Sequence, residues 1–390
     1  MAHFGDVQNE IYLRGLGGEH PELPMTADGL EHAARGVLSG EAFGYIAGGA
    51  SSERTVAANR EAFARWRIVP RMLRTIIERD LSTTVLGTPM TAPVLTAPIG
   101  ALGHVHPDAE RAVTRAAAAL GIPSVLSTAA STSIEDVAAA APEAHRWYQL
   151  YWPRDHELAE SFVRRAEAAG NEAIVVTLDA WVLGWRPRDL QLAYLPFLRA
   201  EGIANYLSDP VFRSRLSDPP EESEEAMQLA ALTCVELFGN PALSWPDIAL
   251  LREWTTLPIV LKGICHPEDA RAALDAGIDG VIVSNHGGRQ VDGGRAALDC
   301  LPDVVAAVDG RAPVLLDSGI RCGADVIIAL ALGAHAVLLG RPWVYGMALA
   351  GERGVTHVLR NLLGDLDLTL ALAGHTRPEE LSAEAVVGVA

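Results

Sequence analysis

The side chains most capable of chemistry lie in one short stretch, residues 284–290, which reads Ser-Asn-His-Gly-Gly-Arg-Gln. It follows the apolar run Gly280–Val283, whose length and β-branched content predict a buried strand, and its glycine pair predicts a turn. His286 can take up a proton near neutral pH, and Arg289 can bind a carboxylate through two parallel hydrogen bonds. The pair therefore indicates deprotonation of an organic acid. For the stretch alone, a turn-capping histidine and a solvated arginine are the better interpretation, so the argument depends on the remaining chain.

A repeated pattern surrounds this stretch from about residue 94 onward. An alanine-rich helix, a small residue with glycine, and an apolar strand ending in a polar group recur four times, which predicts a repeated βα unit. With the gaps filled, the eight predicted strands are Val94–Ala97, Ser124–Ser127, Arg146–Leu150, Ala173–Leu178, Pro258–Lys262, Gly280–Ser284, Pro313–Asp317 and Ala336–Gly340. Eight alternating units favour an α/β fold with a parallel (β/α)8 TIM barrel. An open doubly wound sheet is disfavoured, because residues 98–100 match its phosphate-binding glycine turn poorly.

Two segments fall outside the barrel pattern, although we expect residues 1–390 to form a single domain. Residues 1–70 have helical spacing and predict a helical lead-in. Residues 186–245, after the fourth strand, are far longer than a usual βα link and predict a lid or a disordered insert. The acidic run at 221–225 within it is interpreted as a solvated, flexible loop.

Nearly every predicted strand ends in a polar side chain, and the carboxyl ends of barrel strands are where the chemistry of such folds lies. The ends in order carry Gly100; Ser127; Gln149 and Tyr151; Thr177 and Asp179; Lys262; Ser284, His286 and Arg289; Asp317, Gly319 and Arg321; Gly340 and Arg341. The last two ends place glycines and arginines at helix starts, which predicts a phosphate site. Lys262 could stabilise negative charge on a cofactor ring. Tyr45, beside a glycine-rich turn, is as well suited to the core as to a cleft.

Composition limits the partners. With 390 residues, 49% hydrophobic and 21% charged, the chain is typical of a globular enzyme, and a net charge of −18 argues against nucleic acid or an anionic membrane surface. The four cysteines are widely spaced, so we expect no metal site, no disulfide framework and a cytoplasmic location. The first residues do not read as a secretory signal, and no apolar run approaches the length of a membrane span.

Four motifs together resemble one family, the FMN-dependent 2-hydroxy acid oxidising enzymes of the glycolate oxidase and lactate oxidase group. They lie at 284–290, 317–321, 340–341 and 149–151, and the resemblance runs from about Tyr45 to the chain end. It implies that FMN lies against Ala97, Pro98, Ile99 and Gly100, with Ser127, Gln149, Thr177, Lys262 and Ser284 around the ring and ribityl chain, Asp317 and Ser318 also at the cofactor, and the phosphate on Gly319, Arg321, Gly340 and Arg341.

The resemblance also implies roles around the substrate. His286 would be the base, supported by Asp179. The substrate carboxylate would be held by Arg289, Arg186 and Tyr45, and Tyr151 would bond to the hydroxyl group. This agrees with the chemistry inferred from residue types, since oxidation of a 2-hydroxy acid needs a base, a carboxylate clamp and positive charge near the reduced ring.

Within the family, residues 5–12, residues 184–189 and the long insert resemble lactate 2-monooxygenase, which implies conversion of lactate and O2 to acetate, CO2 and water. The alternative is an oxidase that releases the 2-oxo acid and hydrogen peroxide. A non-catalytic phosphate-ligand barrel or an isomerase without a carboxylate clamp is further away. The resemblance also implies a homo-oligomer, a tetramer or octamer. Ala180 and Ala129 are smaller than residues found in relatives, which leaves room for a larger side chain unless residues 194–197 fill it.

Overall fold

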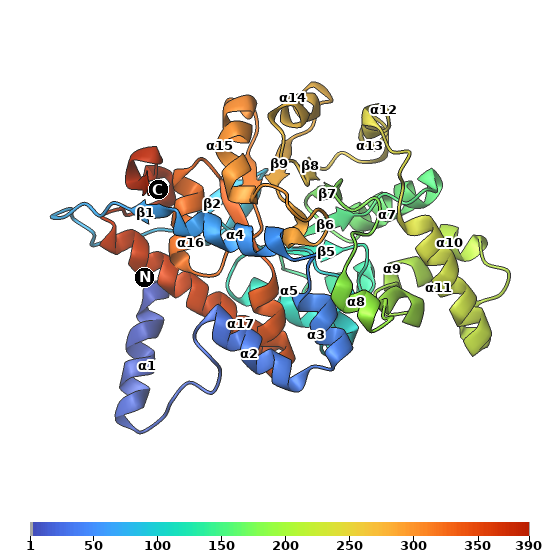
Figure 1. Cartoon of the computed structure of the whole chain (residues 1–390), viewed down its shortest axis with the longest axis horizontal. Coiled ribbons are helices and arrows are strands. Elements are labelled where there is room, and N and C mark those ends of the chain that lie inside the picture. Colours follow the sequence, from blue (N-terminus) through green and yellow to red (C-terminus); the bar gives the residue numbers. More distant parts are fainter. Residues whose placement is uncertain (1–2, 390) are drawn as a thin grey trace.

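The computed structural model describes residues 3–389, and its centre is a closed parallel barrel of eight strands (Figure 1). They are β4 (Val94–Thr96), β5 (Ser124–Ser127), β6 (Arg146–Leu150), β7 (Ile174–Thr177), β8 (Ile259–Lys262), β9 (Gly280–Val283), β10 (Val314–Leu316) and β11 (Ala336–Leu339). Each follows its neighbour in sequence, and β11 pairs with β4 to close the ring, with Leu339 opposite Thr96. The TIM barrel prediction is confirmed, with each strand boundary within one residue of its predicted place. Both faces of these strands are buried, as expected of a parallel barrel covered by helices.

Helices follow the strands and cover the barrel. They are α5 (Ala109–Ala119), α6 (Ile134–Ala140), α7 (His156–Ala168), the short α12 (Trp245–Ile248) and α13 (Leu251–Trp254), α14 (Pro267–Asp275), α15 (Ala297–Val308), α16 (Gly323–Ala331) and the long α17 (Arg341–Leu372). Local sequence sets several starts: the Asp155 carboxylate accepts the backbone N–H groups of Glu157 and Leu158 at the start of α7. Within residues 3–389, every helix is too short or too polar to traverse a lipid bilayer.

The lead-in is helical and ends in a strand that the sequence pattern does not predict. It comprises η1 (Phe4–Asp6), α1 (Val7–Leu16), α2 (Ala27–Val37), α3 (Gly40–Ala47), α4 (Arg54–Ala64) and β1 (Trp66–Ile68). β1 pairs antiparallel with β12 (Val386–Gly388), after η6 (Pro378–Glu380) and η7 (Ala383–Ala385). The lead-in is thereby attached to the chain end, while α1 projects from the body of the molecule (Figure 1).

A two-stranded hairpin, β2 (Thr83–Val85) and β3 (Thr88–Met90), packs against the interior of the barrel. Its buried Val85 and Met90 belong to the same apolar cluster as the inward-facing side chains of the barrel strands. Thr88 accepts a hydrogen bond of 2.9 Å from the Trp147 indole N–H. The hairpin therefore fills the end of the barrel opposite the strand carboxyl ends.

The segment between β7 and β8 is helical and packed rather than disordered. It contains α8 (Pro187–Gln191), η2 lies earlier at Leu102–His104, and then come η3 (Pro196–Arg199), α9 (Ala204–Leu207), α10 (Pro210–Ser214), η4 (Pro220–Glu222) and α11 (Glu224–Phe238). Phe197, Tyr206 and Phe212 are buried in it. The prediction of a flexible acidic loop at 221–225 is wrong, because these exposed residues lie in η4 and the first turn of α11. There Ser223 caps the helix and acidic side chains favour its N-terminus.

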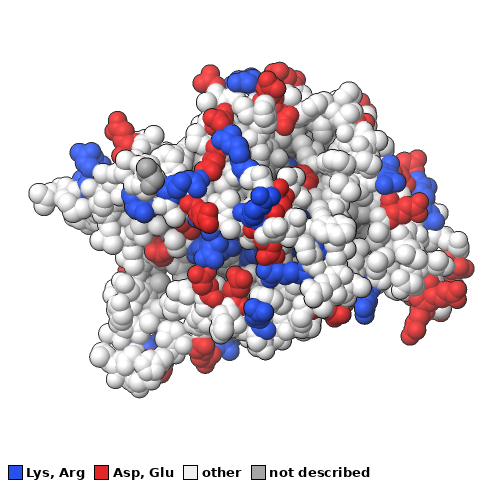
Figure 2. All heavy atoms as spheres, in the orientation of Figure 1, with Lys and Arg blue, Asp and Glu red and all other residues white. Residues whose placement is uncertain are grey.

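Charge is unevenly placed on the surface. The chain carries 49 acidic and 31 basic side chains, excluding histidine. Figure 2 nevertheless shows a group of Lys and Arg side chains around a hollow near the middle of one face, with acidic side chains nearby. Such a local excess of positive charge can attract an anion to a molecule that is acidic as a whole.

Candidate active site

One cavity lies at the carboxyl ends of the barrel strands, with about 1020 Å³ of space not filled by atoms and part of it open to solvent. The structure brings most of the predicted site residues to its wall: Tyr45, Ala97, Pro98, Ile99, Gly100, Tyr151, Arg186, Lys262, His286, Arg289, Asp317, Ser318, Gly319, Arg321, Gly340 and Arg341. The others, Ser127, Gln149, Thr177, Asp179 and Ser284, do not line this wall but contact or neighbour residues that do. The volume suits a cofactor or a similar ligand.

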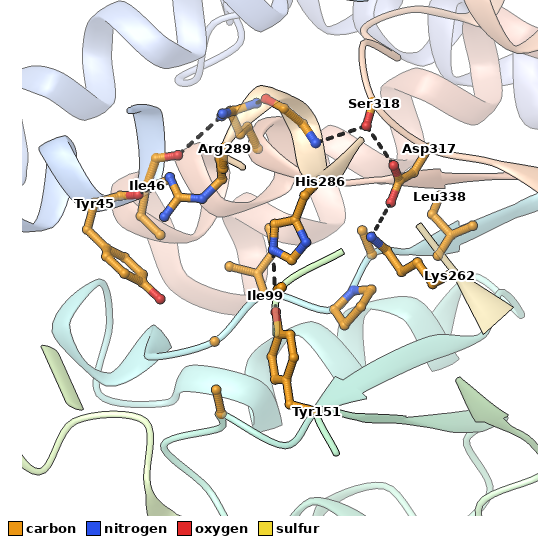
Figure 3. Close-up of a pocket in the computed structure, with 18 of the residues that line it drawn as sticks. Tyr45, Ile46, Ile99, Tyr151, Lys262, His286, Arg289, Asp317, Ser318 and Leu338 are labelled. Atoms are coloured by element: carbon orange, nitrogen blue, oxygen red, sulfur yellow. Dashed lines mark hydrogen bonds and ion pairs between the residues drawn. The ribbon is translucent and has the colours of Figure 1, made fainter. Parts of the chain in front are cut away.

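His286 is held in position by both its backbone and its ring. It begins the turn η5 (His286–Gly288) after β9, with a left-handed backbone (φ 58°) of the strained kind that is often found at functional sites. Its N–H donates to Ser284 Oγ (3.1 Å), and its ring Nδ1 lies 2.8 Å from Asp179 Oδ1. Nε2 therefore faces the Tyr151 hydroxyl, 3.4 Å away (Figure 3). A proton on Nδ1 donated to Asp179 leaves the Nε2 lone pair free to act as a base.

The charges around this pair favour that arrangement. Burial lowers the pKa of His286 below its ordinary value, although Asp179 acts in the opposite direction. Burial also acts to raise the pKa of Asp179, but the attraction of His286 and Lys262 outweighs it and the pKa of Asp179 is lowered. A neutral imidazole thus lies beside an ionised carboxylate, which would stabilise the imidazolium once a proton is taken up.

Two arginines extend into the same cavity from different parts of the chain. Arg289 donates to the backbone carbonyl of Gly48 (2.8 Å) and lies 5.0 Å from the centre of the Tyr45 ring. Arg186 donates to Arg289 O (3.2 Å) and to Gln290 Oε1 (2.8 Å). Among residues 3–389, neither has an ion pair with an acidic side chain. Burial lowers the pKa of Arg186 to about 10, so it stays charged at neutral pH and available to a carboxylate.

Lys262 is a buried cation at the end of β8. Its ammonium lies 3.0 Å from Asp317 Oδ2 and 2.9 Å from Ser284 Oγ. Burial acts to lower the pKa of Lys262, but Asp317 and Asp179 outweigh it and the pKa is raised. The carboxylate of Asp317 also accepts from Ser318 Oγ (2.7 Å), so it serves the Lys262 side of the cavity and does not extend to the arginines of the predicted phosphate site (Figure 3).

The residues present fit an FMN group. Gln149 Nε2 and Thr177 Oγ1 are buried without a hydrogen-bond partner in the described chain, as expected of groups that bond to a ligand. Arg341 begins α17 and donates only to backbone carbonyls, those of Ile46, Gly48 and Gly287. Burial lowers the pKa of Arg341 to about 10, so a buried, charged guanidinium without a carboxylate partner lies at a helix start, where a phosphate is favoured.

The sequence argument missed several apolar wall residues. Ile46, Leu183, Phe238 and Leu338 line the cavity beside the predicted polar groups. Ile46 follows Tyr45 directly and could have been inferred from it. Phe238 has no such signal, because it is the last residue of an insert helix and only the packing of the insert brings it to the site.

Residues 34–388 match the model of the family described as FMN-dependent dehydrogenase. The chain belongs to this family. It is 45% identical over 374 residues to the FMN-dependent alpha-hydroxy acid dehydrogenase qulF of Penicillium citrinum, covering 96% of this chain and 93% of the relative. It is 43% identical over 375 residues to L-lactate oxidase of Lysinibacillus sphaericus (strain C3-41), covering 96% and 95%. A crystal structure of mandelate oxidase superposes with a TM-score of 0.82 and 38% identity, covering 94% and 100%.

These relatives confirm the predicted enzyme class and cofactor: the protein is an FMN-dependent 2-hydroxy acid oxidoreductase. The family prediction is confirmed, but its narrower form is not, because the relatives are named as oxidases and dehydrogenases and not as lactate 2-monooxygenase. They support the alternative, an oxidase, better. The non-catalytic barrel and the isomerase gain no support from them.

Proposed function

We propose that this member of the family is an L-2-hydroxy acid oxidase, which converts its substrate to the 2-oxo acid and passes the electrons to O2 with release of hydrogen peroxide. The observation that carries the proposal is the pairing, in one cavity, of a His286–Asp179 base with two arginines that lack acidic partners among residues 3–389. The names of the L-lactate oxidase and 2-hydroxyacid oxidase relatives support O2 as the acceptor.

Substrate binding begins with its carboxylate. Arg289 and Arg186 would bind it through charge-assisted hydrogen bonds, which orient C2 and its hydroxyl group toward His286. Burial raises the pKa of Tyr45 and of Tyr151, so both phenols stay protonated and can donate hydrogen bonds. Tyr151, 3.4 Å from His286 Nε2, would bond to the substrate hydroxyl oxygen.

His286 Nε2 would then take up the proton lost from the substrate. The Asp179 carboxylate keeps the other ring proton on Nδ1 and stabilises the imidazolium that forms. FMN, when bound, accepts the two electrons removed at C2 and delivers them to O2. Lys262 would stabilise negative charge on the reduced ring, and Gly319, Arg321, Gly340 and Arg341 would hold the phosphate.

Product analysis tests the proposal. L-lactate added without air should bleach the flavin of the purified, FMN-loaded protein. With air, the protein should then form pyruvate and hydrogen peroxide in equal amounts, about one of each per lactate consumed. Failure of lactate and of larger L-2-hydroxy acids to bleach the bound flavin would contradict the proposal.

A second candidate is the lactate 2-monooxygenase reaction, which gives acetate and CO2 when pyruvate and peroxide react before release. The observation that favours it is the packed insert, since Arg186, Phe197 and Phe238 close one side of the cavity. The same aerobic experiment decides: acetate with little free peroxide supports this candidate and excludes the oxidase.

We also propose that the protein self-associates and that its 390 residues act as one domain in the cytoplasm. Three observations support this. The projecting helix α1 exposes Tyr12, Leu13 and Leu16. The lead-in and the insert contribute Tyr45 and Arg186 to one cavity. All four cysteines are free thiols. Light scattering on the full chain and on a variant that starts at residue 20 tests the first point, and a monomeric full chain would contradict it.

A further inference from the structure

A second cavity lies beside the active site, between the strand ends of β6 and β7 and the chain that follows the insert. It also has about 1020 Å³ of space not filled by atoms, and its walls include Trp152, Trp181, Leu243, Trp245 and Ile248. Three residues, Tyr151, Ala180 and Phe238, line both this cavity and the active-site cavity. The two spaces are therefore separated by shared side chains and not by backbone layers.

The partition is an aromatic one that a single side chain could open. The rings of Tyr151 and Phe238 have centroids 4.9 Å apart, and Phe238 also stacks on Phe197 at 5.3 Å. Phe238 is the last residue of α11, and Arg154 fixes the backbone there by donating to Leu237 O and Gly239 O. Because the backbone is anchored, rotation of the Phe238 ring is the simplest change that joins the cavities. Ala180 obstructs the junction with only a methyl group.

Charge distinguishes the two cavities. The active-site cavity is lined by Arg186, Lys262, Arg289, Arg321 and Arg341. The second cavity has no Lys or Arg among its lining residues in the described part of the chain. An anionic head group and the FMN phosphate thus belong to the first cavity, whereas the second offers an environment for apolar groups.

The polar side chains of the second cavity mostly have partners elsewhere. Asn240 Oδ1 accepts from the backbone N–H of Ala242 (3.2 Å), and Ser244 Oγ donates to Asp247 (2.8 Å). The wall available to a ligand is therefore dominated by indole rings and aliphatic side chains, which gain from burying apolar surface.

We propose that this second cavity is a subsite for the apolar side chain of a longer L-2-hydroxy acid, of about six to eight carbons or with an aryl group, whose carboxylate lies on Arg289 and Arg186. The proposal rests on the function proposed above and names its substrate class. The methyl of lactate would end in the first cavity. A longer side chain passes Ala180 and the turned Phe238 ring and is buried among the tryptophans.

A chain-length series is the first test. We expect kcat/KM of the holoenzyme to rise from L-2-hydroxybutanoate through L-2-hydroxyhexanoate to L-2-hydroxyoctanoate, chiefly through KM, by up to about fourfold per buried methylene. A steady fall in kcat/KM along the series overturns the inference.

A filling variant is the second test. Leu243→Trp enlarges a wall residue of the second cavity, and we expect the ratio of kcat/KM for L-2-hydroxyoctanoate to that for L-lactate to fall at least tenfold. Leu229→Trp makes the same change on an exposed position of α11 and should leave the ratio as in the parent protein. If the larger ring prevents folding, Leu243→Phe should lower the ratio in the same direction. A ratio unchanged in a folded Leu243 variant overturns the inference.

Two further readouts separate the possible failures. Anaerobic bleaching by L-lactate tests the proposed function alone, so bleaching by lactate without a preference for longer acids removes only the subsite. If the second cavity instead conducts O2, Leu243→Trp should slow reoxidation of the flavin equally after every substrate. That outcome leaves the substrate ratio unchanged and counts against the subsite.

Discussion

The barrel and the insert form opposite sides of one cavity with different kinds of side chain. The barrel side carries polar groups fixed by short contacts at strand ends, such as His286 to Asp179 at 2.8 Å and Lys262 to Asp317 at 3.0 Å. The insert side carries the aromatic rings of Phe197 and Phe238 and a single guanidinium, that of Arg186. Groups that must be placed to a fraction of an ångström lie on the rigid element, and groups that shape the space lie on the variable one.

This division predicts that barrel substitutions abolish chemistry and that insert substitutions change selectivity. The largest expected effect is that of His286→Gln. Removal of the base should lower kcat/KM for L-lactate by about 10⁴, and the yellow colour of bound FMN should persist because the phosphate residues are untouched. Steady-state kinetics and the flavin spectrum check both points. A loss of less than tenfold would assign the base elsewhere.

The two arginines compare the regions directly. Arg289→Met on the barrel side should lower kcat/KM by about 10³, and Arg186→Met on the insert side by about 10², since each removes a charged partner of the substrate carboxylate. Separate kcat and KM values are needed. Equal losses in kcat would show that the insert supplies transition-state stabilisation as well as shape, and would break the division.

The pH dependence tests the barrel side alone. Because burial places the pKa of His286 below its ordinary value, the base is neutral at pH 7. We expect kcat/KM to be level between pH 7 and 8 and to fall about tenfold per unit once the pH drops below the pKa of His286. Asp179→Asn removes a group that raises this pKa, so the inflection should move to lower pH and the plateau should fall. An inflection that moves upward would contradict the assigned roles.

The smallest effect is expected for Phe197→Ala on the insert. It removes apolar wall surface without touching the polar groups, so KM for L-lactate should rise about tenfold while kcat changes less than about threefold. Leu192→Ala, on an exposed position of the insert, serves as the matched control and should change neither. A hundredfold loss of kcat in Phe197→Ala would mean that the insert positions the reacting atoms.

The same division separates what could be predicted from the sequence from what could not. Barrel strands such as Gly280–Val283 are runs of apolar residues that end in polar ones, so pattern alone locates them within a residue. The three-residue strands β1 and β12 have no periodicity, and β2 and β3 depend on contacts such as that of Thr88 with Trp147. Their existence is decided by tertiary packing.

The site follows this rule as well. His286, Arg289 and Lys262 could be predicted because their chemistry distinguishes them at strand ends. Phe238 and Ile46 could not, because an apolar residue becomes part of a site only through its position. The acidic run at 221–225 was misjudged for a related reason: acidic residues are common in solvated loops, but here Ser223 makes them the first turn of a helix.

The closure of the barrel has a consequence for biosynthesis. The first barrel strand, β4, pairs with the last, β11, and β1 pairs with β12 near the chain end. A nascent chain therefore exposes an unpaired strand edge until residue 339 has emerged from the ribosome. Products of premature termination would keep that edge open, which makes them targets for chaperones and proteases, and only a complete translation product can conceal it.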